Sequence, residues 1–117
     1  MKSLVDYINE AKSKYHPKTK KELKDIIKLL IKNRGNEADL NDIDTSDIDD
    51  MSGLFLRSNF NGNIYNWDVS KVKDMSYMFA DSKFNGDIEA WDVRNVERKD
   101  EMFKNSPLEK NPPKWYK

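Results

Sequence analysis

The 117-residue chain has no cysteine and a single histidine, His16. The lack of cysteine excludes a disulfide framework, a thiol nucleophile and a cysteine-based metal site. One histidine cannot supply a multi-histidine metal site, so we interpret His16, which stands before Pro17, as a turn residue. The sequence also lacks a glycine-rich phosphate loop and a general base for its serines. We therefore predict a protein that is not an enzyme, with no catalytic, cofactor-binding or metal-binding residues.

Long apolar runs are missing as well. The first 15 residues, MKSLVDYINEAKSKY, contain no apolar stretch of the kind that a signal peptide needs. No stretch elsewhere is long and apolar enough to span a bilayer. The sequence therefore predicts a cytoplasmic protein without a membrane partner.

The net charge of zero hides an uneven distribution. Residues 1–35 carry ten Lys/Arg and four Asp/Glu, a net charge of +6, whereas residues 36–103 carry seven and sixteen, a net charge of −9. Residues 104–117 carry four and one, a net charge of +3. Blocks of unlike sign indicate separate structural units and separate surfaces.

An internal repeat of 24 residues covers most of the chain. Residues 60–69 read FNGNIYNWDV and residues 84–93 read FNGDIEAWDV. Three ungapped copies match at this offset, which predicts a solenoid in which each unit buries its apolar side against its neighbours. The matching positions to which we assign a structural role are Trp67, Trp91, Trp115, Asp44, Asp68, Asp92, Phe55, Phe79 and Phe103.

The first 35 residues have the pattern of two helices. Apolar residues at helical spacing mark the first, and Pro17 ends it. Thr19 and Glu22 form a capping-box pattern at the start of the second, and Gly35 stands where a left-handed C-cap is expected. We expect this αα-hairpin to cap the array. The apolar positions of the first helix are Leu4, Ile8, Ala11 and Tyr15.

Within each 24-residue unit the pattern predicts a short strand and then a short helix. The expected strands are 39–43, 63–67 and 87–91, paired in parallel, and the expected helices are 48–55, 72–79 and 96–103. Gly62 and Gly86 would supply positive φ in tight turns. Asp68 and Asp92 would accept backbone N–H bonds at the corners, with calcium ligation as the alternative.

The fold class predicted from these patterns is α+β/solenoid. An N-terminal αα-hairpin cap, residues 1–35, would close a three-turn leucine-rich-repeat-like solenoid with short parallel strands and short helices. The array, residues 36–117, would end at Pro112, because proline cannot donate to a sheet ladder and blunts an edge. We expect the two parts to form one compact unit and a complete small protein.

The segment WDVSKVKDMSYMFADSKFNGDIEAWDVRNV resembles the BspA-type leucine-rich-repeat family, also described as the bacterial surface protein 26-residue repeat. The resemblance covers about residues 39–115. It implies a curved solenoid with a strand and a short helix per turn and no catalytic residues. Many members of that family are exported adhesins, and short cytosolic members occur in bacterial, mobile-element and phage contexts. The matching residues are Trp67, Asp68, Val69, Ser70, Val72, Asp74, Met75, Met78, Phe79, Phe84, Asn85, Asp87 and Ile88.

We therefore expect a protein-binding module that uses an acidic solenoid face, with Tyr65 as an aromatic anchor. Its partner would be basic, and one specific version is a phage or mobile-element inhibitor of a nucleic-acid-binding host defence protein. The other interpretation of the acidic residues is that they cap corners and keep the surface soluble. The candidate partner-binding residues are Asn41, Asp42, Asn63, Tyr65, Asn66 and Glu89.

Two alternative functions stay open. The chain could be a small structural adaptor that self-associates through its helical cap, or a fragment-like surface adhesin repeat. We interpret the lysines of residues 12–34 as the solvated face of amphipathic helices rather than as a nucleic-acid surface, because no groove-reading motif accompanies them. The expected state is a monomer or a small homo-oligomer without cofactors.

Overall fold

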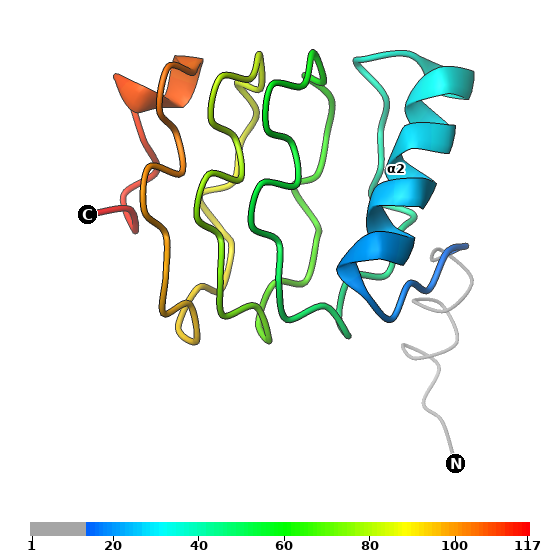
Figure 1. Cartoon of the computed structure of the whole chain (residues 1–117), viewed down its shortest axis with the longest axis horizontal. Helices are drawn as coiled ribbons and strands as arrows, with labels where there is room; N and C mark the ends of the chain where they lie inside the picture. The colour runs from blue at the N-terminus through cyan, green and yellow to red at the C-terminus, as the bar shows by residue number, and fades with distance from the viewer. Residues whose placement is uncertain (1–13) are drawn as a thin grey trace.

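The computed structural model describes residues 14–117. This part of the chain contains one α-helix, α2 (Lys20–Arg34), and one short 3-10 helix, η1 (Pro107–Glu109). The rest of this part of the chain is irregular backbone with isolated parallel bridges and no β-strand. Helix α2 lies at one end of the described structure and η1 lies near the other end (Figure 1).

Helix α2 begins with the predicted capping box and is followed by Gly35, but the predicted left-handed C-cap conformation is wrong. The Thr19 hydroxyl accepts the N–H of Glu22 at 3.2 Å, and the Glu22 carboxylate accepts the N–H of Lys18 at 3.0 Å. Gly35 follows the helix with φ 92° and donates its N–H to the Ile31 carbonyl at 2.7 Å. Its ψ of 175° is extended, so the residue has the predicted positive φ without the left-handed helical conformation.

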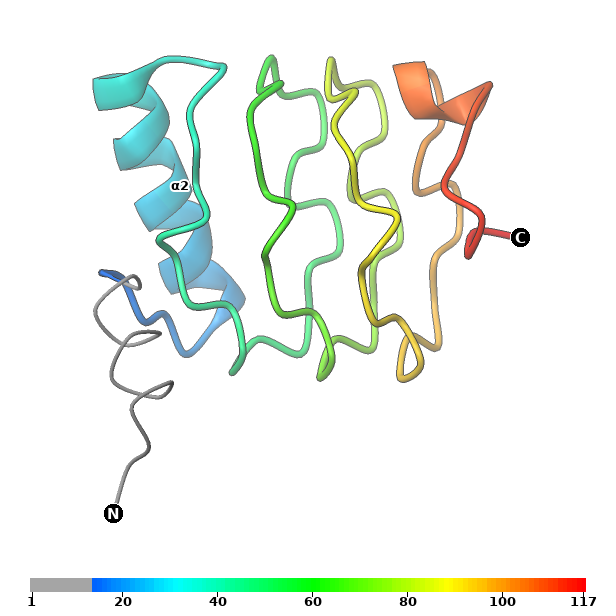
Figure 2. The ribbon, with the colours of Figure 1, turned by 180° about the vertical axis from the view of Figure 1, so that it is seen from behind.

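Residues 36–117 run back and forth beside α2. Segments 50–57, 74–81 and 98–105 lie next to one another on one side, and we call them the front segments (Figure 1). Segments 38–43, 62–67 and 86–91 lie next to one another on the other side, and we call them the back segments (Figure 2). Hydrogen bonds between residues 23 to 25 positions apart join these segments.

The front segments are joined by regular backbone hydrogen bonds. Every second N–H of the first segment donates to a carbonyl of the second, with N to O distances of 2.8–2.9 Å, and the second segment donates to the third at 2.7–3.0 Å. The donors are Met51, Gly53, Phe55 and Arg57, and then Met75, Tyr77, Phe79 and Asp81. The acceptors are Asp74, Ser76, Met78 and Ala80, and then Arg98, Asp100, Met102 and Lys104.

The core lies between the front and back segments. Phe55, Phe79 and Phe103 stack with nearly parallel rings, with centroids 5.5 and 5.8 Å apart. The indole N–H groups of Trp67, Trp91 and Trp115 each donate to a carbonyl 27 residues earlier, at 2.9, 3.3 and 2.9 Å. Leu23, Ile27 and Leu30 of α2 close the core at one end. The core then continues through the chain to Leu108.

The predicted fold class, a three-turn leucine-rich-repeat-like solenoid with short parallel strands and short helices, is wrong. The described residues contain one α-helix rather than one helix per unit, and their only strand-like pairings are isolated bridges that form no sheet. The first helix of the predicted αα-hairpin falls mainly on residues 1–13 and so lies outside the described residues. The division at residue 35 stays a prediction.

The expected short helices fail because of two positive φ angles in each front segment. Residues 53, 77 and 101 have φ between 51° and 61°, as do residues 57, 81 and 105. Each of these residues is the third of a turn closed by an i to i+3 hydrogen bond, such as Leu54 N–H to Met51 O. The apolar spacing that we assigned to a helix is therefore produced by consecutive turns.

The expected strands do not form because nearby side chains accept backbone N–H groups that strand pairing would need. Asp39, Asn63 and Asp87 each accept the N–H two residues further on, at 2.9–3.0 Å. The chain then turns again, since the backbone N–H groups of Trp67 and Trp91 donate to the carbonyls of Ile64 and Ile88. Only the Asp39 to Asn63 bridge remains of the predicted pairing of the back segments.

The corner and turn predictions have mixed outcomes. Asp68 and Asp92 accept the N–H groups of Ser70 and Arg94 at 2.9 and 3.3 Å, so the predicted corner caps are confirmed. The positive φ predicted for Gly62 and Gly86 is wrong. A Cβ on Gly62 would lie 1.9 Å from the Ala38 carbonyl oxygen, so this glycine is required by close approach of two chain segments. Within residues 14–117 no helix is long and apolar enough to cross a membrane.

Candidate protein-binding surface

The six candidate partner-binding residues lie on the three back segments. We call residues 39–42, 63–66 and 87–90 the candidate surface. Asn41, Tyr65 and Glu89 occupy matching positions on the three segments. The structure brings the first two segments together directly, because the N–H of Asn66 donates to the Asn41 side chain at 2.8 Å and Asp39 bridges to Asn63.

Asp42 is occupied by an internal ion pair. Both terminal nitrogens of the Arg34 guanidinium donate to the Asp42 carboxylate, at 3.1 and 2.9 Å, and Arg34 also donates to the Asp39 carbonyl at 3.0 Å. The hydrogen bond from Arg34 lowers the pKa of Asp42 and, reciprocally, raises the pKa of Arg34. Asp42 therefore fixes the end of α2 to the first back segment, and its charge is neutralised within the molecule.

The side chains of Asn41 and Asn63 also have internal roles, and Asn66 takes part through its backbone N–H. The Asn41 side chain donates to the Asp39 carboxylate at 2.8 Å and accepts the Asn66 N–H. Asn63 accepts the N–H of Tyr65 at 3.0 Å. These contacts hold the backbone of the candidate surface in one conformation, and they leave fewer polar groups for a partner than the sequence suggested.

Tyr65 and Glu89 are exposed candidate residues that carry an aromatic ring and a charge toward a partner. The Tyr65 residue is 44% exposed, and its backbone is held by the Asn63 side chain. Glu89 is exposed, and its carboxylate accepts only the backbone N–H of Lys114, at 3.2 Å. Asp39, Asp87 and Glu89 form no ion pair within residues 14–117. The candidate surface thus combines an exposed aromatic ring with unneutralised carboxylates.

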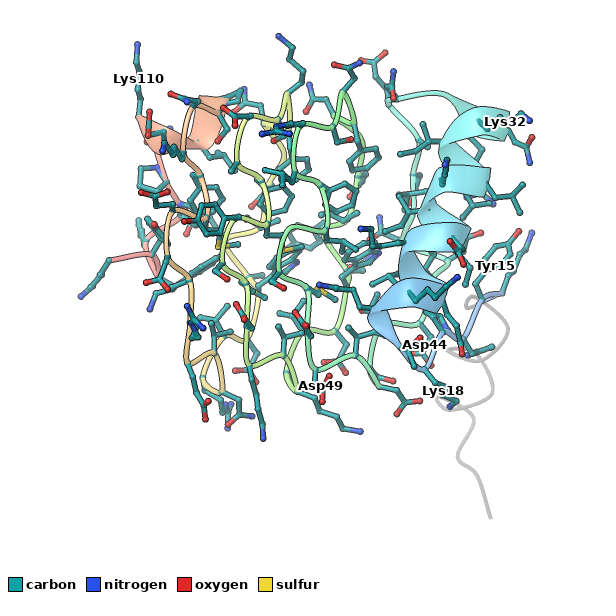
Figure 3. All side chains as sticks on the ribbon, viewed as in Figure 1. Tyr15, Lys18, Lys32, Asp44, Asp49 and Lys110 are labelled. Atoms are coloured by element: carbon teal, nitrogen blue, oxygen red, sulfur yellow. The ribbon has the colours of Figure 1, made fainter. Side chains whose placement is uncertain are left out.

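The aromatic residues that we assigned a structural role do not belong to this surface. Trp115 is partly buried and packs against the core, and the others are core residues: Trp67, Trp91, Phe55, Phe79 and Phe103. Asp44, Asp68 and Asp92 lie at the corners that join back segments to front segments. Asp44 accepts the N–H of Ser46 at 3.0 Å, as Asp68 and Asp92 do for their own neighbours. Figure 3 shows the side chains of Asp44 and Asp49 along this edge of the molecule.

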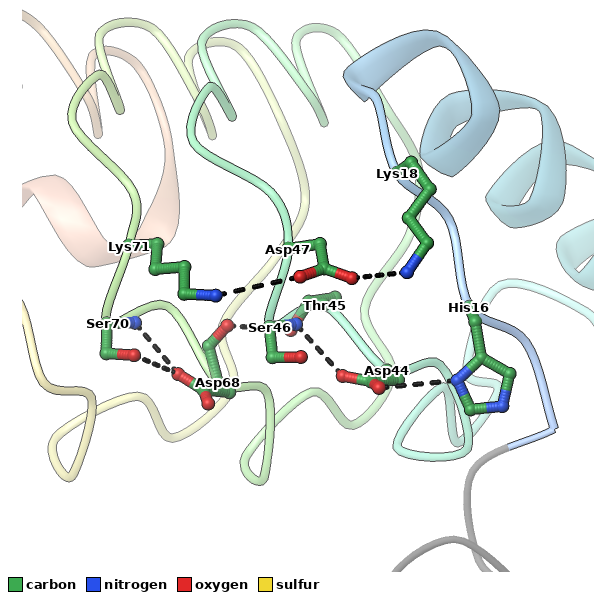
Figure 4. A network of polar contacts seen from close by, with 9 residues as sticks. All are labelled: His16, Lys18, Asp44, Thr45, Ser46, Asp47, Asp68, Ser70 and Lys71. Carbon is green, nitrogen blue, oxygen red and sulfur yellow. Dashed lines mark hydrogen bonds and ion pairs between the residues drawn. The ribbon is translucent and has the colours of Figure 1, made fainter.

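Sequence reasoning did not anticipate the charge network at the first corner (Figure 4). Asp47 lies between two lysines, with its carboxylate 2.6 Å from Lys18 Nζ and 3.6 Å from Lys71 Nζ. His16, which we had interpreted as a turn residue, lies with Nδ1 3.3 Å from the Asp44 carboxylate. The only sequence signal for this contact was the opposite sign of the charge blocks before and after residue 35.

The contacts at this corner shift the pKa values of Asp47, Lys18 and Asp44. The hydrogen bond and charge of Lys18 lower the pKa of Asp47, and Asp47 in turn raises the pKa of Lys18. For Asp44, partial burial acts to raise the pKa, but hydrogen bonds from Ser46 and His16 outweigh it and the pKa is lowered. The carboxylates at this corner are ionised at neutral pH and hold the chain before α2 against the first corner.

The acidic side chains in the part of the chain that the structure describes are not gathered into a metal site. No group of three His, Cys, Asp or Glu side chains there converges in a way that could hold a metal ion. The corner aspartates each serve their own turn, which is the capping role rather than the calcium-binding alternative.

Comparison with known proteins places the chain in a family. A family described as "Mycoplasma protein of unknown function, DUF285" matches residues 24–116, which include most of α2 and all front and back segments. No curated protein and no solved structure gave a match. None of these comparisons ties the chain to BspA-type leucine-rich repeats, so that resemblance stays a prediction. Because the match spans most of the sequence, the chain belongs to the DUF285 family.

Proposed function

We propose that this chain is a non-enzymatic protein-binding module that contacts a basic partner through the candidate surface. The observation that carries the proposal is the exposed Tyr65 ring on a segment fixed by side-chain hydrogen bonds, with carboxylates on the neighbouring back segments that form no ion pair within residues 14–117. Tyrosine supplies a large contact area at a low cost in conformational entropy, which is why it is common among residues that dominate interfaces.

The charge of the surface specifies the class of partner. Asp39, Asp87 and Glu89 add negative charge on the same side as Tyr65, whereas Asp42 is neutralised by Arg34. Such carboxylates attract a basic surface over a distance of about one Debye length, roughly 8–10 Å at moderate salt. A protein that binds nucleic acid in the cytoplasm fits this description, because its basic groove is built to accept phosphate.

The test is affinity capture from a bacterial lysate with matched baits. We would compare the unmodified chain with Tyr65→Ala, and with Tyr77→Ala as the control, because Tyr77 is also 44% exposed but lies on a front segment. The expected result is recovery of a basic protein that is lost with Tyr65→Ala and retained with Tyr77→Ala. Glu89→Gln should weaken the same binding by roughly twofold to fivefold, and this difference should shrink at high salt.

The proposal fails if the captured proteins are not basic, or if Tyr65→Ala captures the same partner as the unmodified chain. It also fails if capture depends on Tyr77 alone, because the front segments would then make the contact. Circular dichroism of each bait confirms that the comparison is between folded proteins.

A further inference from the structure

The hydrogen bonds between front segments have a direction. In the first two segments the odd-numbered residues donate N–H groups toward the following segment, while the even-numbered residues donate N–H groups only within their own turns. A front segment therefore presents only donors on its side toward the C-terminus. The third front segment repeats this pattern, because Met102, Lys104 and Ser106 close its turns onto Lys99, Glu101 and Phe103.

The third segment has no following segment within the described residues. The backbone N–H groups of Lys99, Glu101, Phe103 and Asn105 correspond to the donors of the first two segments, and none of them has an acceptor in residues 14–117. We call these four groups the donor edge. A row of backbone N–H groups without protein acceptors is a template on which an extended segment with free carbonyl groups can pair.

The side chains beside the donor edge are also short of partners. Val69 and Val72 are 1% and 0% exposed, but their equivalents Val93 and Val96 are only partly buried. Trp115 is likewise less buried than Trp67 and Trp91. Contact that the earlier segments receive from the next segment is therefore missing at this end of the molecule.

Two hollows border the edge, and Tyr116 lines both of them. One has a volume of about 680 Å³ and extends from Tyr77 to Lys117, and the other has a volume of about 350 Å³ and reaches from Glu101 to Glu109. Their charged side chains are balanced, with as many basic as acidic residues. The charged residues that line the two hollows are Arg98, Lys99, Lys104, Lys117, Glu97, Asp100, Glu101 and Glu109.

We propose that the donor edge binds an extended segment of a partner polypeptide through carbonyl groups at every second residue of that segment. The pairing would continue the hydrogen bonds that already join the front segments, and Val93, Val96 and Tyr116 would contact apolar side chains of the bound segment. The balanced charge of the hollows favours this neutral backbone recognition over a phosphate or other small anion.

A second copy of this chain does not fit the edge. Two donor edges cannot pair with each other, because neither presents acceptors. The complementary carbonyls belong to the first front segment, which lies against α2, and Lys20 Nζ donates to one of them, the Ser52 carbonyl, at 3.1 Å. The partner is therefore a different polypeptide with free acceptor carbonyls.

The experiment supplies such a segment as a tethered probe. A synthetic peptide with the sequence of residues 96–106 is ligated after Lys117 of the full ¹⁵N-labelled chain through a flexible Gly/Ser linker. The tether gives the probe an effective concentration in the millimolar range. Amide hydrogen exchange is then measured at Lys99, Glu101, Phe103 and Asn105, with the chain lacking a probe as the reference.

The expected result is exchange slowed by about tenfold or more at these four amides, and no slowing with a probe of scrambled sequence. Backbone esters in the probe provide a matched control. Esters that weaken the carbonyls of probe residues 98, 100, 102 and 104 should reduce the protection by roughly twofold to tenfold per bond. Esters that weaken the carbonyls of probe residues 99, 101 and 103 should have less effect.

Three outcomes would overturn the proposal. The first is no protection of the four amides, or equal protection by the scrambled probe. The second is protection in the chain without probe that grows with protein concentration, since a second copy would then be the occupant. The third is equal protection by 20 mM inorganic phosphate, which would identify an anion site. None of these readouts depends on Tyr65, so failure here and failure of the proposed function are distinguishable.

Discussion

Gly62 and Gly53 are glycines for different physical reasons. A Cβ at Gly62 would lie 1.9 Å from the Ala38 carbonyl oxygen and 2.6 Å from the Phe60 ring, whereas a Cβ at Gly53 would meet nothing closer than 4.0 Å. We predict that Gly62→Ala lowers the free energy of unfolding by about 3 kcal/mol, because two chain segments must separate. Gly53→Ala should cost only about 1 kcal/mol, the strain of its φ of 61°. Urea denaturation of both variants measures the difference, and equal costs would contradict the argument.

Arg57 occupies a backbone conformation that suits other residues better. Its φ is 59°, and the matching positions are Asp81 and Asn105, both of types that tolerate left-handed backbone. We predict that Arg57→Asn raises the free energy of unfolding by about 0.5 kcal/mol, while Arg57→Val lowers it by about 1 kcal/mol because β-branched residues are strained there. Chemical denaturation of the pair tests the sign. A stabilising effect of valine would show that the backbone relaxes at this position.

Residue-scale prediction from the sequence succeeded where the interaction is local. The roles of Thr19, Asp68 and Asp92 were predictable because each accepts an N–H within three residues of itself. The role of Gly62 was not predictable, because it depends on a carbonyl 24 residues earlier. The pairing of Asp42 with Arg34 was missed for a related reason: α2 ends in a basic residue, but only the path of the chain after Gly35 shows which carboxylate it meets.

At the scale of the element, α2 depends on its first turn. The Thr19 hydroxyl accepts the Glu22 N–H at 3.2 Å, and this is a bond that alanine cannot make. We predict that Thr19→Ala lowers the free energy of unfolding by about 1 kcal/mol, whereas Thr19→Ser changes it by a few tenths. Thermal unfolding followed by circular dichroism compares the two variants. A loss with serine as large as the loss with alanine would mean that the methyl group, and not the hydroxyl, is responsible.

The Arg34–Asp42 pair gives the end of α2 a dependence on pH. The pKa of Asp42 in the folded state is below its ordinary value of 3.8. The pair therefore contributes its full stability above about pH 4, and the contribution is lost as the pH falls through the lowered pKa. We predict that Asp42→Asn costs about 1 kcal/mol at pH 7 and progressively less below pH 4.

The measurement for this pair is urea denaturation at a series of pH values. The control is Asp49→Asn, because Asp49 is exposed and its side chain forms no ion pair in the described residues. That variant should differ little from the unmodified chain at any pH. A constant cost of Asp42→Asn between pH 7 and pH 2.5 would contradict the ionic origin of the effect.

Helices could be predicted from the sequence only where the backbone N–H groups had no competing acceptors. Helix α2 was predictable because its cap, its apolar spacing and its final glycine all indicate one structure. The spacing of Val72, Met75, Met78 and Phe79 also fitted a helix, yet the N–H groups of residues 75–81 pair with another segment or with local turns. Apolar spacing alone does not distinguish a short helix from consecutive turns.

At the scale of the whole molecule, one row of aromatic rings connects the front segments. Phe79 is fully buried at its centre, stacked on Phe55 and Phe103 at 5.5 and 5.8 Å and on Phe84 at 4.5 Å. Phe103 stands at the end of the row, where Tyr116 meets it edge to face at 4.9 Å. A cavity at the centre cannot be filled from outside, whereas the end of the row can relax toward Tyr116.

We therefore predict that Phe79→Ala lowers the free energy of unfolding by about 4–5 kcal/mol and Phe103→Ala by about 3 kcal/mol, with Phe79→Leu near 1.5 kcal/mol. Because one contiguous core joins α2 to Leu108, the loss should appear as a single transition. Tryptophan fluorescence reports the segments and far-ultraviolet dichroism reports α2, so coincident denaturation curves check this directly. Separate transitions, or a larger loss for Phe103→Ala, would show that the end beside the donor edge is held by contacts other than this row.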